Sequence, residues 1–181
     1  MPGLVAVAAI VSLAPALPPA LEYDRAQVIA GEIWRPLTAQ VVHWSARMTA
    51  ADLGTILVLG AVLEMRSRRA AATAVLAALF LVAAGVHFLP PPLSRYRGGS
   101  GIASGIFVAL ALDLLPAPSV PGVRVAAALA LGLFLVKIAL EAVTGQALFA
   151  GPMAPGVEVA SRAHLLGALG GLIGAASARW P

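Results

Sequence analysis

The chain lacks cysteine entirely and carries little charge. None of its 181 residues is cysteine, which excludes disulfides, thiolate catalysis and cysteine-based metal sites. Charged residues make up only 11% of the sequence, whereas a soluble domain usually carries roughly 25%. So few charged side chains cannot cover a globular surface, and we therefore expect the outer surface to face lipid.

Histidine and basic segments are also scarce. The only histidines are His43, His87 and His164, so we expect no multi-histidine metal site and predict no cofactor. The net charge of +4 comes mainly from arginine, and no basic stretch is interleaved with aromatic residues. We therefore expect no nucleic-acid partner, and in a membrane protein such basic residues set the orientation instead.

Apolar residues are abundant, at 60% of the chain. A helix needs about 20 of them to cross a bilayer, and charged or proline-rich stretches cut the sequence into six apolar blocks. The first block lacks the basic start of a secretory signal peptide, so we prefer a membrane helix to a cleaved signal there. We predict an all-α integral membrane protein, with a single domain over residues 1–181 and six transmembrane helices. The predicted helices span about 3–20, 48–64, 70–88, 100–115, 124–144 and 161–178.

The orientation follows from one short basic stretch. Residues 66–69 read RSRR, and short loops rich in arginine favour the cytoplasmic side. The N-terminus is then inside, and the loops 22–47 and 93–99 are outside. As a result, the fourth and sixth helices both begin at the outer face and run in the same direction.

A serine and a histidine lie at the starts of these two parallel helices. Ser100 opens the fourth helix and His164 lies in the first turn of the sixth, so we expect them at similar depth. Glycines spaced four apart let helix backbones approach closely in lipid. The glycines predicted to pack the two helices together are Gly101, Gly105, Gly167 and Gly171.

This pairing is a candidate for nucleophilic catalysis. A serine hydroxyl becomes a good nucleophile when an adjacent base takes its proton, and histidine is such a base. An ionisable group is also costly to keep within a membrane, so it more often serves a function. The alternative is a serine at a helix start and a packed interfacial histidine, and the spacing alone does not choose between them.

Three short motifs carry a family resemblance. Residues 98–101 read GGSG, residues 163–167 read AHLLG with Gly171 following, and residues 32–35 read EIWR. In this order and at these helix positions, the sequence resembles the rhomboid family of intramembrane serine proteases. The resemblance covers nearly the whole chain and implies a six-helix rhomboid-like bundle.

Further segments are similar to the rhombosortases, a bacterial branch of that family. They are EYDR at 22–25, GEIWRPLT at 31–38, and Lys137, Glu141 and Thr144 in the fifth helix. This resemblance implies a membrane-anchored protein substrate with a C-terminal sorting signal, made of a glycine-rich motif, a transmembrane helix and a basic tail. It implies cleavage near the outer face of the bacterial inner membrane, within the lipid bilayer.

The resemblance also implies roles for individual residues. Ser100 would attack the scissile carbonyl and His164 would take its proton, with no third carboxylate required. His43 would order the outer loop, with an active-site role as the alternative. The residues implied around the oxyanion hole are Gly99, Asp52 and His43, and those implied in the outer loop are Glu32, Trp34 and Arg35.

The sequence departs from the family at the oxyanion hole. Rhomboids typically place a histidine and an asparagine four residues apart on the second helix, and Met48 and Asp52 occupy those positions here. Methionine cannot donate a hydrogen bond, and aspartate donates only when protonated. A rhomboid-fold pseudoprotease, which binds membrane helices without cutting them, is therefore an alternative. A third hypothesis, a small transporter or channel, is motivated by Lys137, Glu141 and Asp113 within helices. It would predict an inverted repeat, and the two halves show none.

Overall fold

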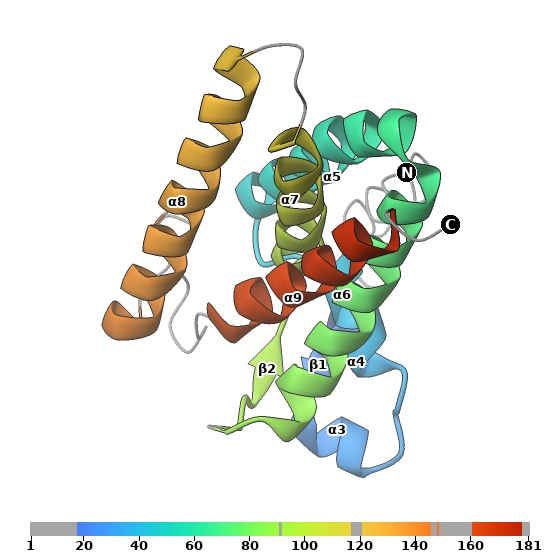
Figure 1. Cartoon of the computed structure of the whole chain (residues 1–181). Helices are drawn as coiled ribbons and strands as arrows, with labels where there is room; N and C mark the ends of the chain where they lie inside the picture. The colour runs from blue at the N-terminus through green and yellow to red at the C-terminus, as the bar shows by residue number, and fades with distance from the viewer. Residues whose placement is uncertain (1–17, 91, 117–120, 146–147, 149–160, 179–181) are drawn as a thin grey trace.

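The structure is a computed structural model that describes residues 18–90, 92–116, 121–145, 148 and 161–178. It is mostly helical, with a small antiparallel sheet at one end (Figure 1). The helix predicted over 3–20 lies outside the described residues, apart from the short α2. In chain order the elements are α2 (Pro18–Leu21), β1 (Tyr23–Asp24), α3 (Arg25–Ile29), α4 (Arg35–Thr38), η1 (Ala39–Val41), α5 (Ala46–Arg66), α6 (Arg68–Phe88), β2 (Arg95–Tyr96), α7 (Ser100–Leu114), α8 (Pro121–Thr144) and α9 (Ser161–Ser177).

Serine caps set the ends of the first long helices. The Ser45 side chain accepts a hydrogen bond from Met48 N at 3.2 Å and starts α5. Ser67 has extended backbone angles, ends α5, and caps α6 by accepting from Ala70 N at 3.1 Å. Such side-chain caps satisfy backbone donors that a helix leaves unpaired at its start. Each long helix therefore begins and ends within a few residues of the bounds expected from the apolar blocks.

Three helices in the described part of the chain are long and apolar enough to cross a membrane: Ala46–Arg66, Arg68–Phe88 and Gly122–Thr144. The α7 helix is apolar but shorter, with 15 residues, and α9 has 17. The predicted helical membrane fold is therefore supported, but the count of six spanning helices is not established.

Glycines pack α9 directly against α7 and α6. A Cβ on Gly167 would overlap the Gly101 carbonyl group, and one on Gly171 would overlap the Gly105 carbonyl oxygen. On the other side of α9, a Cβ on Gly174 would lie 2.9 Å from the Ala70 carbonyl oxygen at the start of α6. Small residues allow this backbone contact. Because Gly101 meets Gly167 and Gly105 meets Gly171, the residues follow the same order along both helices, and α7 and α9 run in the same direction.

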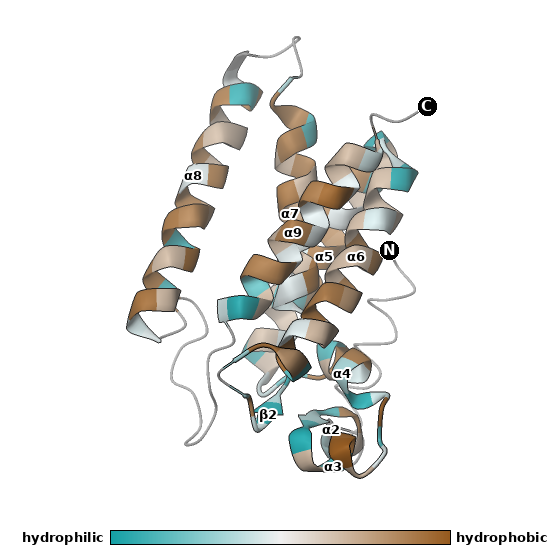
Figure 2. Ribbon diagram, turned by 60° about the horizontal axis from the view of Figure 1, so that its bottom comes forward, coloured by the Kyte–Doolittle hydropathy of each residue, from teal (hydrophilic) through white to brown (hydrophobic). Residues whose placement is uncertain are grey.

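The α8 helix stands at the edge of the bundle and is largely exposed (Figure 1). Along it, apolar side chains such as Leu129 and Leu133 are 63% and 71% exposed, and Figure 2 shows hydrophobic residues along most of its length. One aromatic contact, between Phe107 and Phe134 with ring centroids 5.0 Å apart, links it to α7. An exposed apolar helix of this length is suited to a lipid environment.

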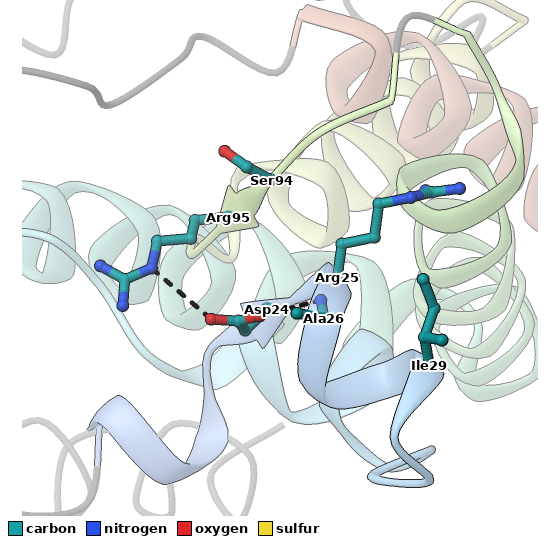
Figure 3. Close-up of a pocket in the computed structure, with 6 residues that line it drawn as sticks. All are labelled: Asp24, Arg25, Ala26, Ile29, Ser94 and Arg95. Atoms are coloured by element: carbon teal, nitrogen blue, oxygen red, sulfur yellow. Dashed lines mark hydrogen bonds and ion pairs between the residues drawn. The ribbon is translucent and has the colours of Figure 1, made fainter.

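A two-stranded sheet at the loop end joins segments far apart in sequence. Tyr23 of β1 pairs with Tyr96 of β2, and Asp24 pairs with Arg95. The prediction of an all-α protein did not include this sheet. An open depression of about 390 Å³ lies beside it. Figure 3 shows the residues that line this depression, with Arg95 facing Asp24. Neither Ser100 nor His164 lines that depression.

Arg35 organises the loop that leads into α5. Its buried guanidinium donates to the carbonyl oxygens of Pro19 and Glu22, both at 2.9 Å, and its Nε donates to Glu32 Oε2 at 2.5 Å. The neighbouring Trp34 is half exposed. The three outer-loop residues of the sequence motif therefore divide into a buried arginine, its carboxylate partner and a surface tryptophan.

Replacing Arg35 with lysine should loosen this loop. A lysine ammonium is a compact donor that cannot reproduce the planar guanidinium fork. Carbonyl oxygens that Arg35 now satisfies would lose their hydrogen bonds, and each unsatisfied oxygen lowers the stability of the loop by about 1–3 kcal/mol. We expect limited proteolysis within residues 19–35 to become at least about tenfold faster. Arg95→Lys is the matched control, because the Arg95 side chain is 57% exposed and its buried partner Glu22 is also paired with Arg97 at 2.7 Å. Equal proteolysis of the two variants would contradict the role of Arg35.

Candidate functional site

Ser100 is the first residue of α7 and follows a turn that requires glycine. Gly98 has φ of +143°, a backbone conformation that side chains disfavour. Its N–H donates to the Ala39 carbonyl oxygen at 3.0 Å, and its carbonyl accepts from the Tyr96 hydroxyl at 2.8 Å. These bonds hold the turn in place and set where α7 begins, and Ser100 itself is partly buried.

Tyr96 serves this turn as a fixed hydrogen-bond donor. Its ring is buried, and burial raises the pKa of the Tyr96 phenol well above its usual range, with a further contribution from the charge of Asp52. The hydroxyl therefore stays protonated at all ordinary pH values and keeps donating to the Gly98 carbonyl.

Asp52 and His43 both meet the backbone of Gly99. The Gly99 N–H donates to Asp52 Oδ2 at 2.9 Å and approaches His43 Nε2 at 3.3 Å. The same two side-chain atoms lie 3.1 Å apart. The sequence placed all three residues near the oxyanion hole, and the structure brings them together beside the start of α7.

The Asp52 carboxylate and the Ser100 hydroxyl border the same glycine. A Cβ built on Gly98 would lie 3.9 Å from Asp52 Oδ2 and 4.0 Å from Ser100 Oγ. Met48 stands one turn before Asp52 on α5, and its thioether cannot donate a hydrogen bond. The side chains on this part of α5 therefore present a carboxylate where a neutral donor is typical of the resembled family.

His164 lies in the first turn of α9, with its side chain 13% exposed. Its Nδ1 is 2.8 Å from Glu141 Oε2 on α8 and 3.4 Å from Lys137 Nζ. Lys137 Nζ is also 2.8 Å from Glu141 Oε2. One carboxylate oxygen is therefore within hydrogen-bond distance of both neighbouring groups, and these contacts of His164 are made by Nδ1.

The contact between α7 and α9 brings Ser100 and His164 to the same end of the bundle. A Cβ on Gly101, next to Ser100, would lie 3.0 Å from the carbonyl oxygen of Ala163, next to His164. Among the described residues, the side-chain hydrogen bonds include none between Ser100 Oγ and His164. Ser104, one turn further along α7, donates instead to the Ser100 carbonyl oxygen at 2.8 Å.

Two contributors to this region were missed by sequence reasoning. The resemblance places Glu141 beside Lys137 in the fifth helix and gives it no part in the reaction, and the sequence indicates no role for Tyr96. The signal for Glu141 was an acid in an apolar helix, which indicates a buried partner. Tyr96 gave no comparable signal, because its role depends on a strand pairing between distant segments.

The described part of the chain contains no group of three histidine, cysteine, aspartate or glutamate side chains that could hold a metal ion. The groups that the described residues present at this end of the bundle are a hydroxyl, an imidazole, carboxylates and backbone N–H groups.

The profile of the rhomboid domain matches residues 30–180. The chain belongs to the rhomboid family. Rhomboid proteins are intramembrane serine proteases that act on membrane proteins within the bilayer, and this rhomboid chain is accordingly a multi-pass membrane protein. A search of the curated proteins finds no match to the chain.

Proposed function

We propose that this rhomboid protein is an intramembrane serine endopeptidase in which Ser100 is the nucleophile and His164 the general base. The observation that carries the proposal is the glycine contact between α7 and α9, which brings the starts of the two helices together. Gly101 and Ala163 meet there, and each is the immediate neighbour of one member of the pair.

The proposed reaction is acyl transfer. Ser100 Oγ forms a bond to the scissile carbonyl carbon while its proton passes to His164 Nε2, and the carbonyl oxygen becomes an oxyanion. The tetrahedral intermediate then collapses, the peptide C–N bond breaks, and the proton moves from Nε2 to the leaving amine. Water then attacks the carbonyl carbon of the acyl-enzyme while His164 Nε2 takes its proton. The second tetrahedral intermediate collapses, the bond to Ser100 Oγ breaks, and Oγ regains a proton from His164.

The depth of the site favours a substrate within the membrane. The 15 residues of α7 span about 22 Å, which is less than the roughly 30 Å of a bilayer core. A helix of this length cannot reach both faces of the bilayer core, so at least one of its ends, at Ser100 or at Leu114, lies within the hydrocarbon region. We infer that the substrate is a membrane-anchored protein with a C-terminal transmembrane helix, as in rhombosortases, and that it is cleaved toward the outer face of the bacterial inner membrane.

The oxyanion would be stabilised mainly by backbone donors. The Ser100 N–H belongs to the first turn of α7, where N–H groups have no partner within the helix, and the helix N-terminus favours negative charge. Each well-placed donor contributes about 3–4 kcal/mol to the transition state. The Gly99 N–H lies at the same corner, but His43 Nε2 and Asp52 Oδ2 are both within hydrogen-bond distance of it.

One observation favours a second candidate function. The Gly99 N–H is already occupied by the Asp52 carboxylate, so a donor that an oxyanion would need is engaged. A pseudoprotease that binds membrane helices without cutting them is consistent with this arrangement. The two functions differ in whether Ser100 is reactive.

Reactivity of Ser100 is the decisive test. In membranes or detergent, we expect a fluorophosphonate probe to label the wild-type protein, and a substrate with a C-terminal membrane helix to be cleaved. Ser100→Ala and His164→Ala should each lower both rates at least about a thousandfold, since residues of such a unit act together.

Ser104→Ala provides the matched control, because Ser104 is on the same helix one turn away. It should stay within about threefold of wild type. A folded wild-type protein with neither labelling nor cleavage would point to the pseudoprotease. Labelling that survives in Ser100→Ala would overturn the assignment of the nucleophile.

A further inference from the structure

Glu141 is a buried carboxylate on a mostly apolar and largely exposed helix. The residue is 1% exposed, and it lies one turn before α8 ends at Thr144. Burial of an ionised carboxylate is costly unless its oxygens are paired. An ionisable residue in a membrane helix is therefore expected to have specific partners, and such residues often serve a function.

Both carboxylate oxygens have partners. Oε1 accepts from the backbone N–H of Leu148 at 3.2 Å. Oε2 lies 2.8 Å from Lys137 Nζ and 2.8 Å from His164 Nδ1. Lys137 Nζ and His164 Nδ1 are 3.4 Å apart, so the ammonium and the imidazole meet at the same carboxylate oxygen.

The lysine alone does not explain this geometry. A pair spaced i, i+4 can form on the surface of α8 without help from another helix. Here the carboxylate instead points to α9 and meets the imidazole across a sequence separation of 23 residues. The cluster thereby ties the end of α8 to the first turn of α9.

This contact determines which nitrogen of His164 carries the proton. A neutral imidazole has one N–H donor and one acceptor nitrogen, and the bond made by one nitrogen sets the role of the other. With Nδ1–H donating to Glu141, Nε2 is unprotonated and able to accept the Ser100 proton. The imidazolium then formed faces a carboxylate that stays ionised throughout.

We infer that Glu141 is the positioning residue of a Ser100–His164–Glu141 triad, holding His164 in the tautomer and orientation that proton transfer requires. The inference rests on the proposed function for its catalytic consequence. It goes beyond the two-residue mechanism that the family resemblance implies, in which no third carboxylate takes part.

Histidine nitrogen NMR tests the contact directly. The chain has three histidines, so ¹⁵N-histidine labelling of the full protein in nanodiscs gives three ring systems, which His43→Gln and His87→Gln assign. We expect wild-type His164 to show a protonated Nδ1 and an unprotonated Nε2. In Glu141→Gln, whose amide can donate to Nδ1, this pattern should shift toward protonated Nε2, with His43 and His87 unchanged.

Kinetics test the consequence for the reaction. Glu141→Gln should lower kcat at least about a hundredfold with KM within about threefold, because a positioning residue acts through His164 and leaves substrate binding unchanged. Glu141→Asp keeps a carboxylate, so its kcat should be at least about tenfold higher than that of Glu141→Gln. Asp113→Asn is the matched control, because it removes a carboxylate that pairs with Arg66 at the other end of α7. It should leave kcat and the three histidine signals unchanged.

The outcomes separate this inference from the proposed function. An unchanged His164 tautomer in Glu141→Gln, with kcat within threefold of wild type, would overturn the positioning role. Equal disturbance of all three histidines, without recovery in Glu141→Asp, would make Glu141 a fold element only and would also overturn it. A wild-type protein with the expected tautomer but no cleavage would instead refute the proposed function and leave the Glu141–His164 contact standing.

Discussion

Gly167→Ala is expected to separate α7 from α9 and to lower both stability and activity. A Cβ at this position would lie 2.6 Å from the Gly101 carbonyl carbon and 2.9 Å from its Cα, and would overlap the carbonyl oxygen. These are backbone atoms that no side-chain rotation can move. Overpacking of this kind costs about 1–3 kcal/mol or more, and for a chain of this size each kcal/mol lowers Tm by about 2–4 °C. Because the clash involves only backbone atoms, we take the upper end of this range, about 3 kcal/mol, and expect a decrease of about 6–12 °C.

The effect on activity should be larger than the effect on stability. The Gly101–Gly167 contact lies one residue from Ser100 and three from His164, so forcing the backbones apart changes the distance between nucleophile and base. A displacement of about 1 Å can cost a hundredfold in rate. We therefore expect the labelling rate of Ser100 to fall at least about a hundredfold at temperatures where the variant is still folded.

Gly132→Ala and Gly54→Ala provide matched controls. Both glycines are within long helices, and among the described residues nothing lies within 4 Å of a Cβ at either position. Their Tm should stay within about 2 °C of wild type, and alanine also favours a helix over glycine. Thermal unfolding in detergent and probe labelling, measured on all three variants, check the prediction. A Gly167→Ala protein as stable and reactive as Gly132→Ala would show that the two helices are not held together by this contact.

Asp52→Asn is expected to accelerate the reaction of Ser100. The Asp52 carboxylate and the Ser100 hydroxyl border Gly98 together, so the negative charge of the tetrahedral intermediate develops near an existing negative charge. At an effective dielectric of about 20, two like charges roughly 6 Å apart repel by about 3 kcal/mol. Asparagine has nearly the same shape, removes this charge, and supplies an N–H donor.

The expected gain is at least about tenfold in probe labelling and in substrate cleavage. The asparagine oxygen can still accept from the Gly99 N–H, as Asp52 Oδ2 does at 2.9 Å, so the turn before Ser100 should keep its geometry. Asp52→Ala separates the two contributions, because it removes the charge without adding a donor. Its gain should be smaller than that of Asp52→Asn.

A slower Asp52→Asn protein would contradict this account. It would mean that the aspartate itself assists the reaction, as a protonated donor or through its 3.1 Å contact with His43 Nε2. Parallel measurement of Tm would show whether the variant remains folded, so that a loss of rate is not mistaken for unfolding.

The chain's class and its main helices follow from the sequence alone. With 11% charged residues, the chain cannot cover a soluble surface however it folds, so its composition dictates a membrane protein. The bounds of α5 and α6 follow from local chemistry, because Ser45 and Ser67 cap helices that arginine and apolar blocks delimit. The GGSG and AHLLG motifs likewise singled out Ser100 and His164 from short-range pattern.

Only the tertiary structure decided what surrounds those two residues. The Glu141–His164 contact joins α8 and α9 across 23 residues, and the Asp52–Gly99 bond joins α5 to the start of α7 across 47. The pairing of Tyr23 with Tyr96, which positions the turn before Ser100, joins strands that flank two long helices. Sequence periodicity indicates which residues share one face of a helix, but these contacts also depend on the angle at which two helices cross and on how each is rotated about its axis. Backbone approach at glycines sets that packing, and it is a property of the folded chain as a whole.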